Sequence, residues 1–166
     1  MPKLIKDGVV AENSWRCIAK DAGIADAIND PSNQILVHLS LWQNHKDELE
    51  ASQKEIGVWL DSEDDPYDLA NDAAELPLIA VNFPVFRDGR AFSSAAILRE
   101  RLSFKGDLRA IGDVLRDQVF YMKKCGINSF EIEDSLDAEE ILQAFADFKD
   151  SYQSTVEIPE PLFRRR

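Results

Sequence analysis

Short apolar runs and amphipathic segments alternate regularly along the second half of this chain. The run at 78–82 has the length and composition of a buried strand, while Leu115, Val119 and Met122 share one face of a helix. Repeated strand–helix pairs are typical of right-handed βαβ units around a parallel sheet. We therefore predict an α/β fold, with alternating strands and helices around a largely parallel sheet that is either open or a partial barrel. The expected strands are 78–82, 108–111 and 129–132, and the expected helices are 92–102, 114–124 and 137–149.

The first half of the chain carries weaker signals. Lys6-Asp7-Gly8 is a turn sequence between apolar residues, and it predicts a short N-terminal hairpin over 4–10. Leu41, His45 and Leu49 recur at helical spacing and predict a helix. Further strands are expected at 35–39 and 56–60, and a further helix at 66–74.

Length and composition fit one globular domain. A chain of 166 residues buries about 70% of its unfolded surface on folding, and 45% of its residues are hydrophobic. We predict a single α/β domain over 1–155, followed by an extended basic C-terminal tail over 156–166. The first eight residues show no signal-peptide pattern, so we expect a cytoplasmic protein.

Metal and cofactor motifs are not evident. Cys17 and Cys125 lie far apart in sequence, which favours neither a disulfide framework nor a cysteine-rich metal site. The Cys125 thiol ends an expected helix, where the helix dipole raises a thiol pKa and disfavours a nucleophile. His38 and His45 are seven residues apart, but the first falls in an expected strand, so they do not share a helix face. No glycines cluster as a dinucleotide-binding loop requires. We expect no metal site, and the sequence leaves the cofactor unknown.

The charge of the chain is uneven. Its net charge is −12, but residues 82–124 hold nine basic and five acidic residues, a net of +4 that leaves −16 for the remainder. An acidic protein repels nucleic acid and anionic lipid, and no apolar run approaches the length of a membrane span, so we expect neither partner. The basic segment suits a small anion or an acidic protein surface. The alternative is that its arginines and lysines only balance neighbouring carboxylates.

The densest group of polar side chains follows the expected strand 78–82. Loops that leave the carboxyl ends of parallel strands face one edge of the sheet, where ligands bind. Arg87 and Arg90 lie in such a loop, and a planar guanidinium matches a carboxylate, sulfate or phosphate with paired donors. We therefore regard both as candidates for binding an oxyanion. The other interpretation is a tight turn at Asp88-Gly89 flanked by arginines.

Other polar residues of this region have structural alternatives. Ser93 and Ser94 either donate hydroxyl hydrogen bonds to a ligand or cap the following helix, and capping is favoured. Asp113 is likewise either a general acid or base or a helix N-cap, and capping is favoured. Arg109 alternates with its neighbours in the expected strand, so its side chain points to the opposite face from theirs. A buried arginine on that face needs a carboxylate partner, and we expect Glu131 on the next strand to supply it. The candidate anion- or partner-binding residues are Arg87, Asp88, Gly89, Arg90, Ser93, Arg109, Asp113 and Arg116, and no catalytic residue is assigned.

Four segments are distinctive: LIKDGVV, LPLIAVNFPVFRDGRAFSSAAILRERL, the run 106–118, and CGINSFEI. They span nearly the whole chain up to Ile132, and they resemble the bacterial family known as domain of unknown function nine-three-four. In that family the gene commonly lies beside the one for assimilatory sulfite reductase, and members are sometimes labelled oxidoreductases of sulfite reduction. The resemblance therefore implies a role in sulfur assimilation. Where family members often carry Tyr-Ser-Gln-Ala-Arg, this chain has the run 92–96, Phe-Ser-Ser-Ala-Ala, so no role for a tyrosine hydroxyl or extra arginine carries over.

Two functions follow. The first is an accessory protein of assimilatory sulfite or sulfate reduction that docks on sulfite reductase, or on a neighbouring enzyme of the sulfur pathway, through its basic segment. The alternative is a small-anion-binding enzyme of oxidoreductase type, whose Arg87 and Arg90 hold sulfite, sulfate or a phosphorylated intermediate. The absence of a cofactor motif favours the first, and the charged residues gathered on one edge favour the second. A homodimer is a further alternative, because outward Arg and Asp side chains on helices also suit an interface.

Overall fold

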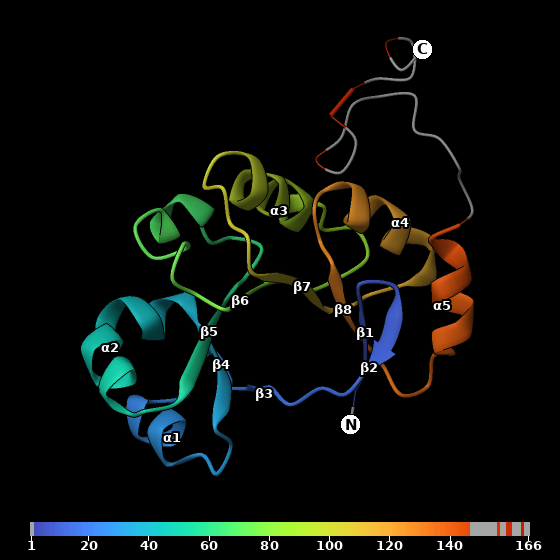
Figure 1. Cartoon of the computed structure of the whole chain (residues 1–166). Helices are drawn as coiled ribbons and strands as arrows, with labels where there is room; N and C mark the ends of the chain where they lie inside the picture. Colours follow the sequence, from blue (N-terminus) through green and yellow to red (C-terminus); the bar gives the residue numbers. More distant parts are fainter. Residues whose placement is uncertain (1, 147–155, 157–158, 161–163, 165–166) are drawn as a thin grey trace.

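The computed structural model describes residues 2–146, 156, 159–160 and 164. Its strands all belong to one eight-stranded sheet. Its strands are β1 (Lys3–Lys6), β2 (Val9–Ala11), β3 (Arg16–Cys17), β4 (Gln34–His38), β5 (Glu55–Leu60), β6 (Leu78–Phe83), β7 (Asp107–Gly112) and β8 (Ser129–Ile132). They follow the order β2-β1-β8-β7-β6-β5-β4-β3. Strands β3 to β8 are parallel, and the hairpin β1–β2 joins β8 in the antiparallel sense. The sheet is curled into a half-barrel (Figure 1).

Helices cover the convex side of the half-barrel (Figure 1). They are α1 (Ile24–Asn29), α2 (Leu39–Ala51), the 3-10 helix η1 (Pro66–Leu69), α3 (Arg90–Glu100), α4 (Arg116–Lys124) and α5 (Ala138–Ala144). Because the parallel strands follow chain order, right-handed crossovers place the connecting helices on the same face. Ile35, Val58 and Ile79 point to that face and are fully buried in the main apolar core. The α/β fold and the largely parallel sheet expected from the sequence are thus confirmed, in the partial-barrel form.

Residues 12–15 join the two edges of the sheet and force it to curl. β2 and β3 are the outermost strands, yet only these four residues separate Ala11 from Arg16. An extended chain of this length spans about 18 Å, whereas the edges of a flat eight-stranded sheet lie about 34 Å apart. The edges must therefore approach each other, and this segment crosses the open side of the half-barrel in Figure 1. We call residues 12–15 the strap.

Asn13 and Trp15 fasten the strap to the concave face of the sheet. Asn13 Oδ1 accepts a hydrogen bond from Arg109 Nη1 at 3.0 Å, and Asn13 Nδ2 donates to Glu131 Oε2 at 3.0 Å. Trp15 packs against a small apolar cluster on the same face. That cluster consists of Leu36, Trp59, Leu78, Ala80 and Ile111. The strap therefore has one polar and one apolar anchor.

Arg109 lies buried on this concave face, with 2% of its surface exposed. Its Nη2 lies 3.1 Å from Asp107 Oδ2, its Nε donates to Ser129 Oγ at 3.0 Å, and Lys6 Nζ lies 3.2 Å from the same Asp107 oxygen. The expectation that Glu131 pairs with Arg109 is wrong. The carboxylate that pairs with Arg109 belongs to Asp107, two residues earlier on the same strand, and both side chains point to one face because strand side chains alternate.

Most other expected elements are present with shifted ends. The N-terminal hairpin is confirmed, and the strand expected at 129–132 coincides with β8. The helix expected at 66–74 is shorter, because only η1 forms there and turns follow it. The end of the helix expected at 137–149, and most of the tail expected at 156–166, lie outside the described residues. In the part that the structure describes, no helix is long and apolar enough to cross a membrane.

Removal of Arg109 tests the buried network. Arg109→Ala leaves the Asp107 carboxylate buried without its arginine partner. Of the two cations that contact this carboxylate in the buried network, Lys6 alone then remains. We expect the free energy of unfolding, measured by urea denaturation, to fall by about 3–5 kcal/mol, because a buried charge loses its partner. The double variant Asp107→Asn/Arg109→Met removes both charges and is expected to recover much of this loss. A loss below about 1 kcal/mol for Arg109→Ala would contradict a central role for the pair.

Candidate functional site

The carboxyl ends of β4, β5, β6 and β7 meet at one edge of the half-barrel, because these strands are parallel and adjacent. We call it the C-terminal edge. Gly112, the last residue of β7, has φ +89° and lies against the Phe83 carbonyl, so β6 and β7 approach closely where they end. A side chain at Gly112 would separate them. The polar residues of this edge come from His38 and from the segments 61–65, 84–89 and 113–115.

Asp61 organises the middle of the C-terminal edge. Its carboxylate accepts hydrogen bonds from Lys20 Nζ at 2.8 Å, Asn82 Nδ2 at 3.1 Å and the Ser62 backbone N–H at 2.9 Å. Burial acts to raise the pKa of Asp61, but the hydrogen bonds from Lys20, Asn82 and Ser62 outweigh it and the pKa is lowered. The carboxylate form of Asp61 is therefore favoured. Lys20 also bonds to Glu63, so this lysine is shared between two carboxylates.

Arg90 is held by Asp88. Its Nη2 lies 2.7 Å from Asp88 Oδ2, and its Nε and backbone N–H both donate to Asp88 Oδ1, at 3.0 and 3.1 Å. The same Nη2 donates to Ser62 Oγ at 3.0 Å. These bonds, first of all those from the Arg90 guanidinium, hold the pKa of Asp88 well below its usual range. The Arg90 guanidinium therefore already has a carboxylate partner, in paired geometry.

The β6–α3 loop presents apolar side chains and a cation to solvent. Val85 is 57% exposed and Phe86 is 52% exposed, and Arg87 beside them is exposed and makes no hydrogen bond or ion pair with any residue that the structure describes. Gln118 Nε2 donates to the Phe86 carbonyl at 3.2 Å, which ties the loop to α4. Tyr121 on α4 is 55% exposed. We call Val85, Phe86, Arg87 and Tyr121 the loop–α4 surface.

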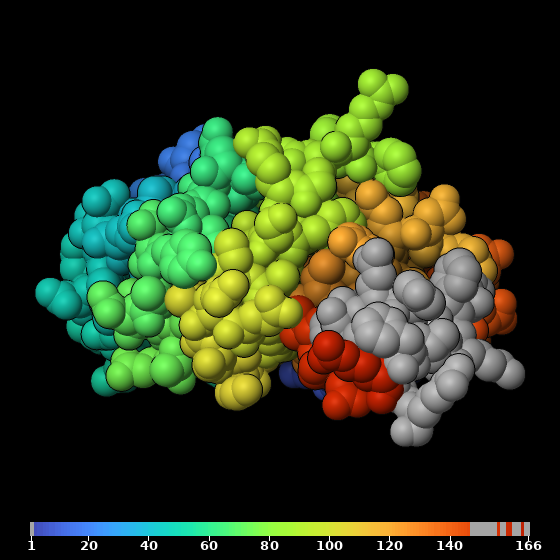
Figure 2. All heavy atoms as spheres, turned by 90° about the horizontal axis from the view of Figure 1, so that it is seen from above, coloured from blue at the N-terminus to red at the C-terminus, as the bar shows by residue number. Residues whose placement is uncertain are grey.

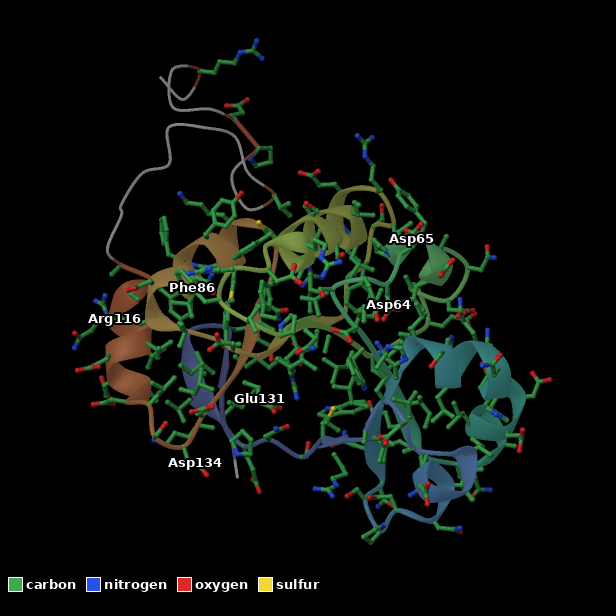
Figure 3. The ribbon with its side chains drawn as sticks, turned by 180° about the vertical axis from the view of Figure 1, so that it is seen from behind. Asp64, Asp65, Phe86, Arg116, Glu131 and Asp134 are labelled. Atoms are coloured by element: carbon green, nitrogen blue, oxygen red, sulfur yellow. The ribbon has the colours of Figure 1, made fainter. Side chains whose placement is uncertain are left out.

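The loop–α4 surface is continuous with the core through a row of aromatic rings. The Tyr121 ring lies 4.8 Å from that of Phe92, and the Phe92 ring lies 5.0 Å from that of Phe83, both in edge-to-face geometry. Phe83 is buried in the main core. In Figure 2 the yellow-green loop projects from the molecule beside the orange α4. Figure 3 shows Phe86 and Arg116 on one side of the edge, and Asp64 and Asp65 on the other.

His38 lies at the junction of β4 and α2 and is 3% exposed. Its Nδ1 accepts a hydrogen bond from the Ser40 backbone N–H at 3.2 Å and lies 2.8 Å from Ser40 Oγ. Its Nε2 lies 2.9 Å from Asp64 Oδ2, although the carboxylate is not aligned as a hydrogen-bond acceptor. The ring of Trp59 packs against the imidazole in edge-to-face geometry at 4.6 Å. Because Nδ1 accepts the backbone N–H, Nε2 carries the proton of the neutral ring and faces Asp64.

The structure gathers part of the set of candidates named from the sequence. Arg87, Asp88, Gly89 and Arg90 all lie at the C-terminal edge as expected. Arg109 does not, because it is buried on the concave face. The remaining candidates lie at the edge or just behind it: Ser93 is exposed within α3, Arg116 is exposed in the first turn of α4, and Asp113 precedes α4.

The helix caps expected from Ser93, Ser94 and Asp113 are wrong. α3 begins at Arg90 with Gly89 as its N-cap, so Ser93 and Ser94 lie inside the helix and do not cap it. α4 begins at Arg116 with Leu115 as its N-cap, and Asp113 instead donates its backbone N–H to the Phe83 carbonyl at 2.7 Å. At α3 the Asp88 carboxylate instead accepts the backbone N–H of Arg90, the first residue of the helix. At α4 the close pairing of β6 with β7 holds the Asp113 backbone, and this tertiary contact overrides the local capping preference.

Sequence reasoning missed the residues that β4 and β5 bring to the edge. The acidic segment 61–65 looks solvated in the sequence, yet Ser62 is buried and Asp61 and Asp64 are partly buried in hydrogen bonds. His38 was a usable signal, since a histidine that ends a strand and directly precedes a helix is placed at this edge by topology. Nothing local in the sequence indicates that Asp64 lies against it.

Among the described residues, no group of three or more His, Cys, Asp or Glu side chains is arranged to hold a metal ion. A cavity of about 440 Å³ lies at the amino end of β8, away from the C-terminal edge, where Asn128, Phe130 and Phe145 help to line it. Burial raises the pKa of the Cys125 thiol to about 11, which agrees in direction with the expectation for this residue.

The pairing of Asp88 with Arg90 can be measured directly. Arg90→Ala is expected to move the pKa of Asp88 up toward the ordinary aspartate value of about 3.9, followed by carboxyl carbon NMR during an acid titration. Because the folded-state pKa lies below the unfolded value, the pair stabilises the fold above that ordinary value, and the contribution is lost as the pH falls through the folded-state pKa. Arg87→Ala is the matched control and should leave Asp88 unchanged. Equal shifts in both variants would contradict a specific pair.

Comparison with known proteins supplies a family. A family model described as "Bacterial protein of unknown function (DUF934)" matches residues 57–163, which include most of β5, all of β6, β7 and β8, and therefore most of the C-terminal edge. A search of curated proteins found no match. The family match extends over more than half of the chain and agrees with the resemblance carried by the segments quoted above. The chain belongs to the bacterial family of proteins of unknown function DUF934.

Proposed function

We propose that the protein is an accessory protein of assimilatory sulfite reduction, which acts with sulfite reductase by docking through the loop–α4 surface. One observation carries the docking proposal: an apolar and cationic surface is exposed on a strongly acidic protein. The pathway comes from the family resemblance, in which the gene commonly lies beside that of sulfite reductase. The role is therefore to bind a partner enzyme rather than to perform the reduction itself.

The loop–α4 surface has the composition of a binding site. Val85, Phe86 and Tyr121 are each more than half exposed, and exposed apolar groups that lie together mark sites of interaction. Aromatic residues and arginine are the types that dominate protein interfaces. The edge-to-face aromatic rings beneath Tyr121 and the hydrogen bond from Gln118 hold this surface in place, so little conformational entropy is lost on binding.

Charge identifies the partner surface. The protein carries a net charge of −12, and an acidic partner would be repelled from most of its surface. Arg87, exposed at the centre of the loop–α4 surface, gives that surface a cation in the segment of the chain whose net charge is positive. A complementary partner site has an apolar pocket for Phe86 and a carboxylate for Arg87. Electrostatic orientation then favours one docking geometry.

The alternative function is a small-anion-binding enzyme of oxidoreductase type at the C-terminal edge. In its favour, Arg87 is an exposed guanidinium at that edge. Against it, Arg90 is already paired with Asp88, and Asp61, Glu63 and Asp64 crowd the neighbouring loop. These carboxylates repel sulfite, sulfate and phosphate. The geometry therefore favours the accessory role.

Substitution of the loop tests the docking proposal. Phe86→Ser and Arg87→Glu are each expected to raise the Kd for sulfite reductase from the same bacterium by about tenfold or more, since each removes a central contact. Affinity is measured by a pull-down followed by titration calorimetry. The matched controls are Tyr67→Ser, another half-exposed aromatic, and Arg101→Glu, another exposed arginine, and both should bind like wild type.

Three outcomes would contradict the proposal. The first is that wild type does not bind sulfite reductase, and the second is that the control variants weaken binding as much as the loop variants do. Wild type could also bind sulfite or sulfate with an affinity that Arg87→Ala abolishes, which would support the anion-binding enzyme instead. Sedimentation of each variant tests whether the loop–α4 surface instead forms a homodimer. Loss of self-association in Phe86→Ser would make this surface a contact between two copies of the chain. A deletion strain that grows equally on sulfate and on cysteine would count against the pathway.

A further inference from the structure

Ser40, His38 and Asp64 form a row of side chains at the C-terminal edge that partner docking does not require. Ser40 is exposed, and its Oγ lies 2.8 Å from His38 Nδ1. The opposite nitrogen of the same ring lies 2.9 Å from Asp64 Oδ2. A hydroxyl, an imidazole and a carboxylate in hydrogen-bond reach of one another, in this order, are the parts of an activated nucleophile.

We propose that the C-terminal edge hydrolyses small, uncharged acyl esters through an acyl-Ser40 intermediate. In this reaction Ser40 is the nucleophile and His38 is its general base. This activity is independent of the docking proposed above, because the loop–α4 surface contributes no residue to it. The proposal concerns chemistry at β4, the acidic segment 61–65 and the first turn of α2.

The hydrogen-bond pattern places the protons where the reaction needs them. His38 Nδ1 accepts from the Ser40 backbone N–H, so this nitrogen has its lone pair directed at Ser40 and can accept the hydroxyl proton. Nε2 then carries the ring proton beside the Asp64 carboxylate, which stabilises the imidazolium formed during the reaction. Asp64 is itself held in place because its Oδ2 accepts the Asp61 backbone N–H at 2.7 Å. Asp64 is thus a positioning residue.

Burial keeps water away from the His38 imidazole. The imidazole is 3% exposed, and Trp59 covers one of its sides, so water does not compete with Ser40 for Nδ1. A buried imidazole nitrogen with no aligned acceptor is unusual, since buried polar groups are nearly always paired. Nε2 is such a group, and a modest shift of Asp64 on formation of the imidazolium would complete the bond.

The steps balance without a cofactor. Ser40 Oγ attacks the acyl carbon while the hydroxyl proton of Ser40 passes to His38 Nδ1. The bond from the acyl carbon to the leaving alkoxide then breaks, and the alkoxide takes the proton from His38. Water then attacks the acyl-serine, gives its proton to His38, and the acid leaves as Ser40 regains that proton. Protonation of Nδ1 releases the Ser40 N–H, which can then donate a hydrogen bond to the oxyanion at the N-terminus of α2.

Charge decides which esters suit the site. Asp61, Glu63 and Asp64 surround it with carboxylates, and Lys20 is shared between the first two. An ester that carries a negative charge is repelled by these groups, whereas an uncharged ester is not. We therefore expect 4-nitrophenyl acetate to react faster than the mono-4-nitrophenyl ester of succinic acid.

Burst kinetics test the nucleophile. The whole protein, mixed with 4-nitrophenyl acetate, is expected to release about one nitrophenolate per chain in a burst, followed by slower turnover, with the acetyl group on Ser40 by peptide mass spectrometry. Ser40→Ala should abolish the burst, and Ser40→Cys should keep it. Ser135→Ala is the matched control: Ser135 is exposed and lies 3.2 Å from a Glu133 oxygen, but has no imidazole, so the burst should be unchanged.

His38→Asn separates catalysis from helix capping. Asparagine is a good N-cap and can accept the Ser40 N–H, so the variant is expected to fold with the urea midpoint of wild type while the acylation rate falls at least about tenfold. Asp64→Asn, which can still accept the Asp61 N–H, should lower kcat and leave KM unchanged. Three results would overturn the proposal: no burst with wild type, acetylation at residues other than Ser40, or an acylation rate in folded His38→Asn equal to that of wild type.

Discussion

The strap is the constraint on which the rest of the structure depends. Residues 12–15 connect the outermost strands of the sheet, and four residues are too few to reach across a flat sheet of this width. The sheet therefore curls into a half-barrel, with its helices outside and the strap across its open side. The strap partly covers the concave face, because Trp15 packs on its apolar cluster and Asn13 bonds to Arg109 and Glu131. A buried arginine is tolerated there because Asp107 and Ser129 complete its hydrogen bonds.

The parallel pairing of neighbouring strands determines what the C-terminal edge can do. It brings the ends of β4, β5 and β6 together, so that Asp64 meets His38, Asp61 meets Asn82, and the Ser62 hydroxyl meets Arg90. Apart from His38 Nε2, which has no aligned acceptor, these groups are hydrogen-bonded, and Arg90 is also paired with Asp88. The β6–α3 loop, which lies beyond this cluster, keeps its apolar residues and Arg87 in solvent. One edge therefore offers two separate regions: a hydrogen-bonded acidic cluster around His38, and an apolar cationic surface suited to a partner.

The sequence predicts what is local and periodic, and little of what depends on long-range contacts. The alternation of apolar runs and amphipathic segments was enough to predict the parallel sheet and the position of Arg87 to Arg90 at one edge, and the turn sequence at 6–8 was enough to predict the N-terminal hairpin. The partner of Arg109 was predicted wrongly, because strand alternation places both Asp107 and Glu131 on its face and does not choose between them. The contact of His38 with Asp64 joins the last residue of β4 to the segment after β5, and it depends on the parallel pairing of these two strands. Helix starts failed where strand pairing overrode capping preferences, as at Asp113.

The central claim is that the loop–α4 surface is the face that meets sulfite reductase. Hydrogen exchange of the full chain, followed by mass spectrometry with and without that enzyme, measures this most directly. Docking is expected to slow exchange in the loop 84–89 and in α4, and to leave α1, which lies elsewhere on the half-barrel, unchanged. Slower exchange confined to α1 or the strap, or no change anywhere at saturating enzyme, would contradict the account.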